Sequence, residues 1–151
     1  MKLELKHLAP YLPYGLKVEY TGKEKGIFTL IGLRTESDIF DFQATLRTSA
    51  RPPHNYFFTH KNFKPILRPW DDLKETITHN GLSFVPSSFL YDNFGVSVDD
   101  ASDLVLDYYE IGLTDSPLTG FSIIMQMIEW HFDVFGLIDS GLAISYKEAG
   151  L

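Results

Sequence analysis

Apolar and polar residues alternate with a period of two along much of the N-terminal third of the chain. The alternation runs through three stretches, LKVEY at 16–20, IFTLIGL at 27–33 and IFDFQATLR at 39–47. The segments between them, TGKEKG and ESD, have the composition of turns. A period of two is typical of a strand with one buried face, so the pattern predicts an antiparallel meander of about three strands.

Helical spacing replaces this alternation further along the chain. Asp71 is a suitable N-cap for a helix over 72–79, and Asn80-Gly81 then provides a left-handed stop. A short helix is expected after Pro86. The predicted fold class is therefore α+β, with a small N-terminal antiparallel sheet of about three strands packed with a mainly helical C-terminal half. The length of 151 residues predicts a single domain over 1–151.

Two more helices are expected in that half, one over 100–110 capped by Asp99 and a longer one over 117–135 that ends at Gly136. On a helical wheel of the longer one, Glu129 and Asp133 lie on a narrow polar stripe, whereas His131 lies in the middle of a wide apolar arc. His131 would then point away from both Glu129 and Asp133, although the three residues are close in sequence. The wheel predicts His131 as a buried polar residue, with a pH-responsive role as the alternative.

Composition excludes several classes of site. The chain is 44% hydrophobic and 15% aromatic, which supports a folded core. It has no cysteine, so disulfides, thiolate catalysis and iron–sulfur sites are excluded. The N-terminal segment has charges inside its apolar run, unlike a signal peptide, and no stretch reaches 18 uninterrupted apolar residues. A cytoplasmic protein without membrane contact is expected.

Charge is distributed unevenly along the chain. Residues 1–74 carry 12 Lys and Arg against 8 Asp and Glu, whereas 75–146 carry 11 acidic residues and no Lys or Arg. Such asymmetry suggests a nucleic-acid surface, an acidic interaction face, or contact between copies of the chain. The alternative is a single domain whose halves attract each other modestly.

Candidate chemistry is sparse. Asp99, Asp103 and Asp107 recur at helical spacing and could hold Mg²⁺ or Ca²⁺ through carboxylate oxygens, although aspartates near a helix start also stabilise the helix itself. The chain contains no GxSxG, P-loop, GxGxxG or HExxH motif. No catalytic residue and no cofactor is predicted, and an enzyme is not expected.

The segment 45–70, TLRTSARPPHNYFFTHKNFKPILRPW, combines cations with aromatic rings and contains no acidic residue. Cations that follow phosphates beside aromatic platforms for bases are what single-strand binding requires. The same pattern arises when aromatic rings enter the core and charged heads stay in water. The candidate nucleic-acid-binding residues are Arg47, Arg51, Tyr56, Lys61, Phe63, Lys64 and Arg68.

Four stretches together resemble a known group of proteins: HLAPYLPYGLKV (7–18), KPILRPWDDL (64–73), HNGLSFVP (79–86) and EWHFDVFGLIDSGLAI (129–144). In order and spacing they are similar to short uncharacterised proteins that occur in phage and prophage gene sets of Bacteroidetes. The resemblance implies no activity and no site residue. It implies a protein made in a bacterial host cell from a mobile element, with host or phage components as targets.

These observations predict a non-enzymatic accessory protein of a phage or other mobile element that works by protein–protein contact, with a partner that the sequence does not identify. The alternative is single-stranded nucleic-acid binding through 45–70. A metal-dependent hydrolase on the aspartate face ranks third. The protein–protein contact could also join copies of this chain into a homo-oligomer.

Overall fold

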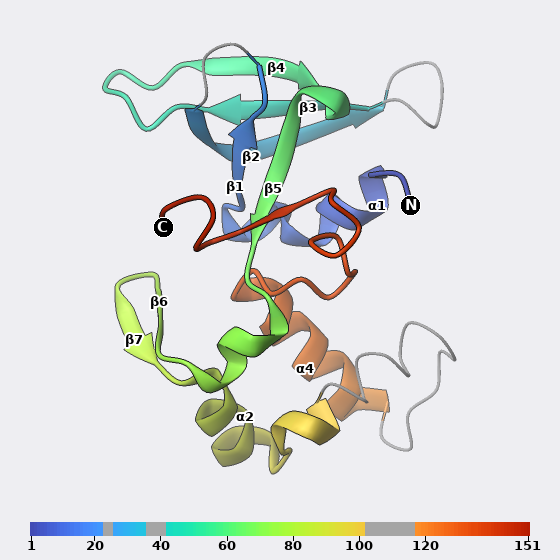
Figure 1. Ribbon diagram of the computed structural model, residues 1–151, viewed down its shortest axis with the longest axis vertical. Helices are drawn as coiled ribbons and strands as arrows, with labels where there is room; N and C mark the ends of the chain where they lie inside the picture. The colour runs from blue at the N-terminus through green and yellow to red at the C-terminus, as the bar shows by residue number, and fades with distance from the viewer. Residues whose placement is uncertain (23–25, 36–41, 102–116) are drawn as a thin grey trace. The chain divides into compact units, whose positions relative to one another are not determined.

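The computed structural model describes residues 1–22, 26–35, 42–101 and 117–151, and these form two compact units (Figure 1). Unit 1 comprises Met1–Arg68 and Phe135–Leu151, and unit 2 comprises Pro69–Val134. Each unit is described by itself below. The expectation of one domain over the whole chain stays a prediction.

Unit 1 is built on a six-stranded mixed sheet with the strand order β4-β3-β2-β1-β5-β8 (Figure 1). All neighbouring pairs are antiparallel except β5 and β8, which run parallel. The strands are β1 (Lys17–Tyr20), β2 (Gly26–Thr35), β3 (Phe42–Arg47), β4 (Asn55–Thr59), β5 (Phe63–Leu67) and β8 (Ile144–Ser145).

Alternation in the sequence becomes alternation of faces in this sheet. In β3, Phe42, Ala44 and Leu46 are buried, whereas the residues between them are more exposed. Opposite residues of an antiparallel pair share a face, so the core face passes from Leu46 to Leu30 on β2. The three strands expected from the sequence are present, with the third described from Phe42 onward; residues 39–41 lie outside the described residues.

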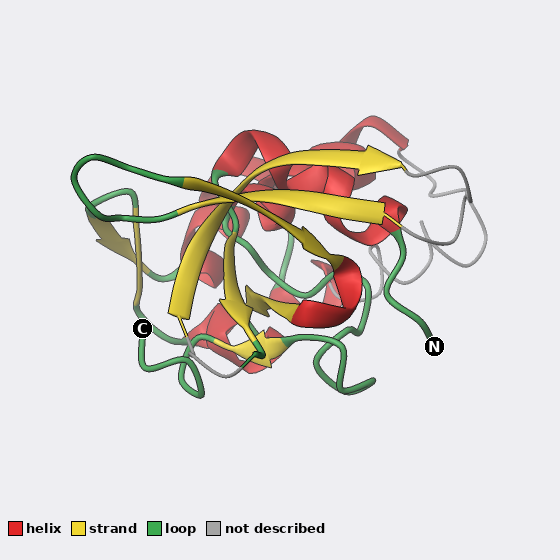
Figure 2. Cartoon of the chain, turned by 90° about the horizontal axis from the view of Figure 1, so that it is seen from above, coloured by secondary structure: helices red, strands yellow, loops and turns green. Residues whose placement is uncertain are grey.

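Aromatic contacts show that the sheet curls strongly. Phe58 of β4 lies 4.6 Å from Tyr20 of β1 and 5.9 Å from Phe28 of β2, between ring centroids, although β3 separates β4 from both strands in the sheet. Figure 2 shows the long strands bent and crossing one another. The register of β2 against β3 shifts between Leu30 and Gly32, and such a bulge increases local twist.

The sequence reading missed β5 because of its proline. Pro65 faces Val18 of β1, and the Thr21 N–H donates to the Asn62 carbonyl at 2.9 Å. Hydrogen-bonded pairs alternate along antiparallel strands, so Val18 and Pro65 form a non-hydrogen-bonded pair and the proline nitrogen faces away from β1. On that other side the pairing with β8 begins only at Ile66. No ladder hydrogen bond is lost, and the proline is tolerated.

Short helical segments complete unit 1: α1 (Leu5–Leu8), a 3-10 segment η1 (Ala9–Tyr14) and a 3-10 turn η2 (His60–Asn62). The C-terminal segment turns at Gly141, whose φ is +69°. There the Gly141 N–H donates to the Ile138 carbonyl and the Leu142 N–H to the Leu137 carbonyl, both at 2.9 Å. This is the Schellman pattern, which places Leu142 just before β8.

Unit 2 contains less helix than the sequence pattern predicts. Its elements are a 3-10 turn η3 (Trp70–Lys74), the hairpin of β6 (Ile77–His79) and β7 (Leu82–Phe84), α2 (Pro86–Phe94) and α4 (Pro117–Glu129). Residues 98–101 are also helical, and the Ser97 hydroxyl accepts a hydrogen bond from the Asp100 N–H at 3.2 Å. Ser97 therefore caps this start in place of Asp99; residues 102–110 of the expected helix lie outside the described part.

The helix expected over 72–79 is replaced by the turn η3 and strand β6. Asn80 and Gly81 have φ values of +50° and +80°, and they join His79 to Leu82 in the β6–β7 register. Two consecutive residues with positive φ form the type I′ turn of a two-residue hairpin, for which Asn-Gly is the preferred pair. The Asn-Gly pair therefore signalled a hairpin and not a helix stop.

The predicted fold class is wrong. A six-stranded mixed sheet and a second, two-stranded sheet replace the small three-stranded sheet. The C-terminal half contributes β6, β7 and β8 and only short described helices, so it is not mainly helical. Within the described ranges, no helix combines the length and the apolar character needed to cross a membrane.

The Asn-Gly turn supplies a stability test. Gly81→Ala should lower the free energy of unfolding by about 1 kcal/mol, because a residue with a Cβ is strained at positive φ. A Cβ at this position would meet no atom within 4 Å, so steric collision should not add to that effect. Urea unfolding would measure the change, with the exposed Thr76→Ala as a control. Equal stability of Gly81→Ala and wild type would contradict the turn.

Candidate functional site

The structure separates the basic and aromatic residues of 45–70 into three places. Arg47 and Arg51 are exposed at the end of β3 and in the loop that follows, and Tyr56 is exposed on β4. Lys61 is exposed and Lys64 half-buried near the start of β5, where Phe63 is buried. Arg68 is 7% exposed, directly after β5. The segment does not present its candidate residues on one face.

An open face does exist on the outer side of β1 to β4, and it contains only part of that segment. Thr45 faces Phe57 across β3 and β4, so both side chains lie on the face opposite to Ala44 and Leu46. Phe57 is 71% exposed. It is the most exposed aromatic ring of unit 1 among the described residues.

Cations flank Phe57 in the neighbouring rows of this face. On one side the register aligns Asn55, Arg47, Thr29 and Lys17; on the other it aligns Thr59, Gln43 and Arg34. Successive rows on one face lie about 7 Å apart along the strands. Among the described residues of β1 to β4, the outer side therefore carries three cations, Lys17, Arg34 and Arg47, around one exposed ring. We call these four residues the open basic face.

Hydrogen bonds within the rows orient the three cations. The Arg47 Nε donates to the Asn55 Oδ1 at 3.2 Å. The Arg34 guanidinium donates to the Gln43 Oε1, also at 3.2 Å. The Lys17 Nζ donates to the Thr29 Oγ1 at 2.7 Å. Each of these arginines has further guanidinium N–H groups, and both side chains are exposed to solvent.

Among the described residues of these strands, one carboxylate shares this side of the sheet. Glu19 lies two residues beyond Lys17 on β1 and faces Ile27 on β2 and Lys64 on β5. It is therefore outside the rows of Arg47 and Arg34 and next to another cation. Counted over the described residues of these rows, the charge around Phe57 is positive.

Sequence reasoning missed Lys17 and Arg34 because both lie outside the acid-free segment 45–70. Period two gives a signal that could have found Lys17, since its neighbour Val18 is buried. For Arg34 the period alone is misleading, because the register shift between Leu30 and Gly32 changes which residues of β2 face the outer side. The pairing register is what brings them to Arg47, and register is a property of the tertiary structure.

The inner side of the same strands carries a different aromatic group. Tyr20, Phe28, Tyr56 and Phe58 contact one another with ring centroids 4.6–6.5 Å apart. Such distances are those of packed aromatic pairs. Tyr56, a candidate base-stacking residue, thus belongs mainly to this packed cluster, whereas its neighbour Phe57 points to the open side.

The buried Arg68 packs against the ring of Tyr146 within unit 1. Its guanidinium carbon lies 4.0 Å from the centroid of the Tyr146 ring, and the Tyr146 N–H donates to the Leu67 carbonyl at 3.1 Å. A guanidinium over an aromatic face gains cation–π attraction, and the gain is larger away from water. Arg68 and Phe63 are buried and so are not part of a surface for nucleic acid.

His131 lies beyond the end of α4 and not within a helix. The helix ends at Glu129, His131 has a φ of +64°, and the Phe132 N–H donates to the Met127 carbonyl at 2.9 Å. This is a Schellman ending with histidine in the position that glycine usually takes. The helical wheel therefore does not apply to His131 or Asp133, and both are only 4% exposed.

The ring of His131 meets that of His79 in an edge contact, with centroids 5.3 Å apart. His79 belongs to β6, so this contact links the hairpin to the end of α4 within unit 2. It gives His131 a packing role.

Two of the three aspartates proposed to bind a metal lie outside the described residues. Asp99 is exposed near the start of the helical residues 98–101, whereas Asp103 and Asp107 are among the residues not described. Among the described residues, no group of three or more His, Asp or Glu side chains is placed to hold a metal ion.

Comparisons with protein-family models, with curated proteins and with solved structures find no match to this chain. The resemblance to phage and prophage proteins therefore stays an expectation, and the function has to be argued from the geometry.

Tyr146 gives a testable pH dependence. Burial raises the pKa of Tyr146 above its ordinary value near 10, and the Arg68 charge opposes the rise without cancelling it. The folded chain therefore holds this proton more tightly than the unfolded chain does. The resulting stabilisation is complete below a pH of about 10 and is lost as the pH rises above it.

Tyr146→Phe keeps the ring beneath Arg68 and removes the titrating hydroxyl. Its free energy of unfolding, measured by urea at a series of alkaline pH values, should fall less steeply than that of wild type. Identical alkaline profiles for the two proteins would show that Tyr146 does not contribute.

Proposed function

We propose that unit 1 binds single-stranded nucleic acid through the open basic face. The observation that carries the proposal is the exposed ring of Phe57 between a row with Arg47 and Lys17 and a row with Arg34. Bases of any sequence stack on an exposed aromatic ring, and cations on either side attract the phosphates that flank a stacked base. This supports binding with little sequence preference.

The distribution of charge between the units supports the same proposal. Unit 1 carries 12 Lys and Arg against 8 Asp and Glu, whereas unit 2 carries Lys74 alone against 12 acidic residues. The net charges are thus +4 and −11. A polyanion would meet an attractive field at unit 1 and a repulsive one at unit 2, which favours a short, local binding site over a path along the whole chain.

The proposal includes the setting that the resemblance implies. The protein would be a non-enzymatic accessory protein of a phage or other mobile element, acting in the cytoplasm of a bacterial host cell. Single-stranded nucleic acid is an intermediate of phage replication, so this setting and the proposed ligand are compatible.

Fluorescence anisotropy with labelled single-stranded DNA and RNA tests the proposal. Binding should weaken with salt, with a slope of log K against log salt of about −2, as expected if the three cations each neutralise a phosphate. Arg47→Gln and Arg34→Gln should each weaken binding and make this slope less steep. Lys74→Gln is the matched control, because it removes the same charge from unit 2.

The aromatic contribution is tested in the same assay. Phe57→Ala should cost about 1–3 kcal/mol of binding free energy, the usual value of one stacked base. Tyr91→Ala removes an exposed ring from unit 2 and should leave binding unchanged. Absence of binding at low salt, or equal losses for Arg47→Gln and Lys74→Gln, would contradict the proposed function.

A second candidate is protein–protein contact through unit 2. Leu82 on β7 and Tyr91 on α2 are 70% and 66% exposed, and the partly exposed Phe89 packs on Phe84 and Trp130 with centroids 6.2 and 5.1 Å away. Apolar side chains exposed on an acidic unit favour a partner with a basic surface. A second copy of this chain offers such a surface on its unit 1.

Sedimentation velocity over a range of protein concentrations tests this form of contact. The average mass should rise with protein concentration, fall as salt is added, and rise less for Leu82→Asp than for wild type. A monomer at every concentration and at low salt would exclude contact between copies.

A further inference from the structure

Unit 1 contains a pocket of about 430 Å³ that the open basic face does not include. It is formed by segments that are distant in sequence: the residues before α1, the end of β1, the turn η2 with the start of β5, and the Gly141 turn. The volume lies within the usual range for small-molecule sites.

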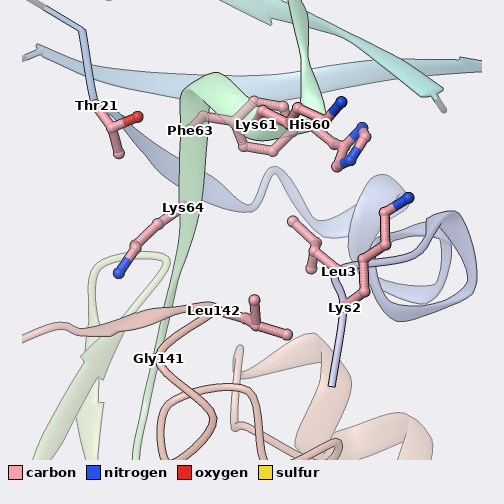
Figure 3. A pocket seen from close by; sticks show the side chains of 9 residues that line it. All are labelled: Lys2, Leu3, Thr21, His60, Lys61, Phe63, Lys64, Gly141 and Leu142. Carbon is pink, nitrogen blue, oxygen red and sulfur yellow. The ribbon is translucent and has the colours of Figure 1, made fainter.

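Apolar side chains form much of the pocket wall. Leu3, Phe63 and Leu142 lie between Lys2 on one side and Lys64 on the other (Figure 3). Leu3 and Phe63 are buried, so they are fixed by the core of unit 1 and do not depend on a ligand for their position. Leu142 is set by the Schellman turn at Gly141, which directs it toward the same space (Figure 3). Such a wall favours the apolar part of a ligand.

The polar part of the lining is cationic. Lys2, Lys61 and Lys64 all line the pocket, together with His60 and Thr21. None of the nine lining residues, all in the described part of unit 1, is acidic. Lysines at the rim of an apolar wall complement an anionic group and would be repelled by a cationic one.

Carboxylates lie near two of the lining lysines, Lys64 and Lys2. Hydrogen bonds from the Ser145 backbone N–H and hydroxyl, and then the nearby charge of Lys64, hold the pKa of Glu148 below its ordinary range. Glu4 forms an ion pair with Lys6 at 3.0 Å, and its pKa is lowered by Lys6 first and more weakly by Lys2.

We propose that this pocket binds a small molecule that joins one anionic group, a carboxylate or a phosphate, to an apolar body. The apolar body would lie against Leu3, Phe63 and Leu142, and the anionic group would lie at the lysine rim. The proposal does not depend on nucleic-acid binding, because the pocket lacks Lys17, Arg34, Arg47 and Phe57.

Isothermal titration calorimetry of the full chain with octanoate, octyl phosphate and octanol tests the proposal. At least one of the two anions should bind, and octanol should bind at least about tenfold more weakly than that anion, since it lacks the charge that the lysines select. The stronger of the two anions identifies the preferred head group.

Variants then locate the site. Lys61→Glu should weaken binding of the anion by about tenfold or more. Lys147→Glu, which reverses the charge of an exposed lysine outside the pocket, should leave it unchanged. Leu142→Gln should weaken binding of the anion and of octanol alike, because it removes part of the apolar wall and no charge. Circular dichroism would confirm that each variant is folded.

Any one of three results would overturn the inference. The first is that neither anion binds at millimolar concentration, and the second is that octanol binds as tightly as the anions. The third is that Lys61→Glu and Lys147→Glu have equal effects on binding of the anion. None of these results depends on nucleic-acid binding by the variants of Arg34, Arg47 and Phe57. Failure of the pocket proposal and failure of the proposed function can therefore be distinguished.

Discussion

The pairing of β5 with β1 is the constraint on which unit 1 depends. β5 is the only strand of the described residues that contacts both the meander, through β1, and the C-terminal strand β8. Ile66 and Leu67 of β5 and Val18 of β1 are fully buried, so the pairing is held by apolar burial as well as by the ladder. The same strand carries Phe63 and Lys64 into the pocket and ends beside Arg68.

Curvature of the strands β1 to β4 gives the two sides of the sheet different roles. On the inner side, rings from β1, β2 and β4 meet and pack together, which consumes most of the aromatic surface of these strands. On the outer side, Phe57 remains exposed among cations. Consecutive residues of one strand, Tyr56 and Phe57, thus serve the core and the surface because successive side chains of a strand point to opposite faces.

The two units carry net charges of opposite sign. The positive charge of unit 1 and the negative charge of unit 2 belong to units that each have buried apolar residues of their own, such as Leu46 in the first and Ile123 in the second. Attraction between opposite halves of a single core is therefore not needed to explain the asymmetry. Under the proposed function, the positive sheet unit and the acidic unit with exposed apolar groups would serve different partners.

The sequence by itself determined the positions of β1, β2 and most of β3, because period-two burial is a local property of each strand. It also placed α2 after Pro86 and marked Asn80-Gly81 as a stop, but it carried the longest helix to Gly136, whereas α4 ends at Glu129. It could not decide what the Asn-Gly pair joined: the same pair suits a helix end and a hairpin, and only the pairing of Ile77 with Phe84 distinguishes them. Pro65 likewise argues against a strand until the direction of its nitrogen is known.

The candidate sites depended on tertiary structure still more. The sequence identified Arg47 and Tyr56 but not the neighbouring Phe57 as candidates, and it grouped them with Phe63 and Arg68, which the fold buries. Register joined Lys17 and Arg34 to Arg47, and chain closure joined Lys2, Lys61 and Leu142 around one pocket. Residues distant in sequence become neighbours only through long-range pairing and packing, and no local pattern along the chain encodes which strands will meet.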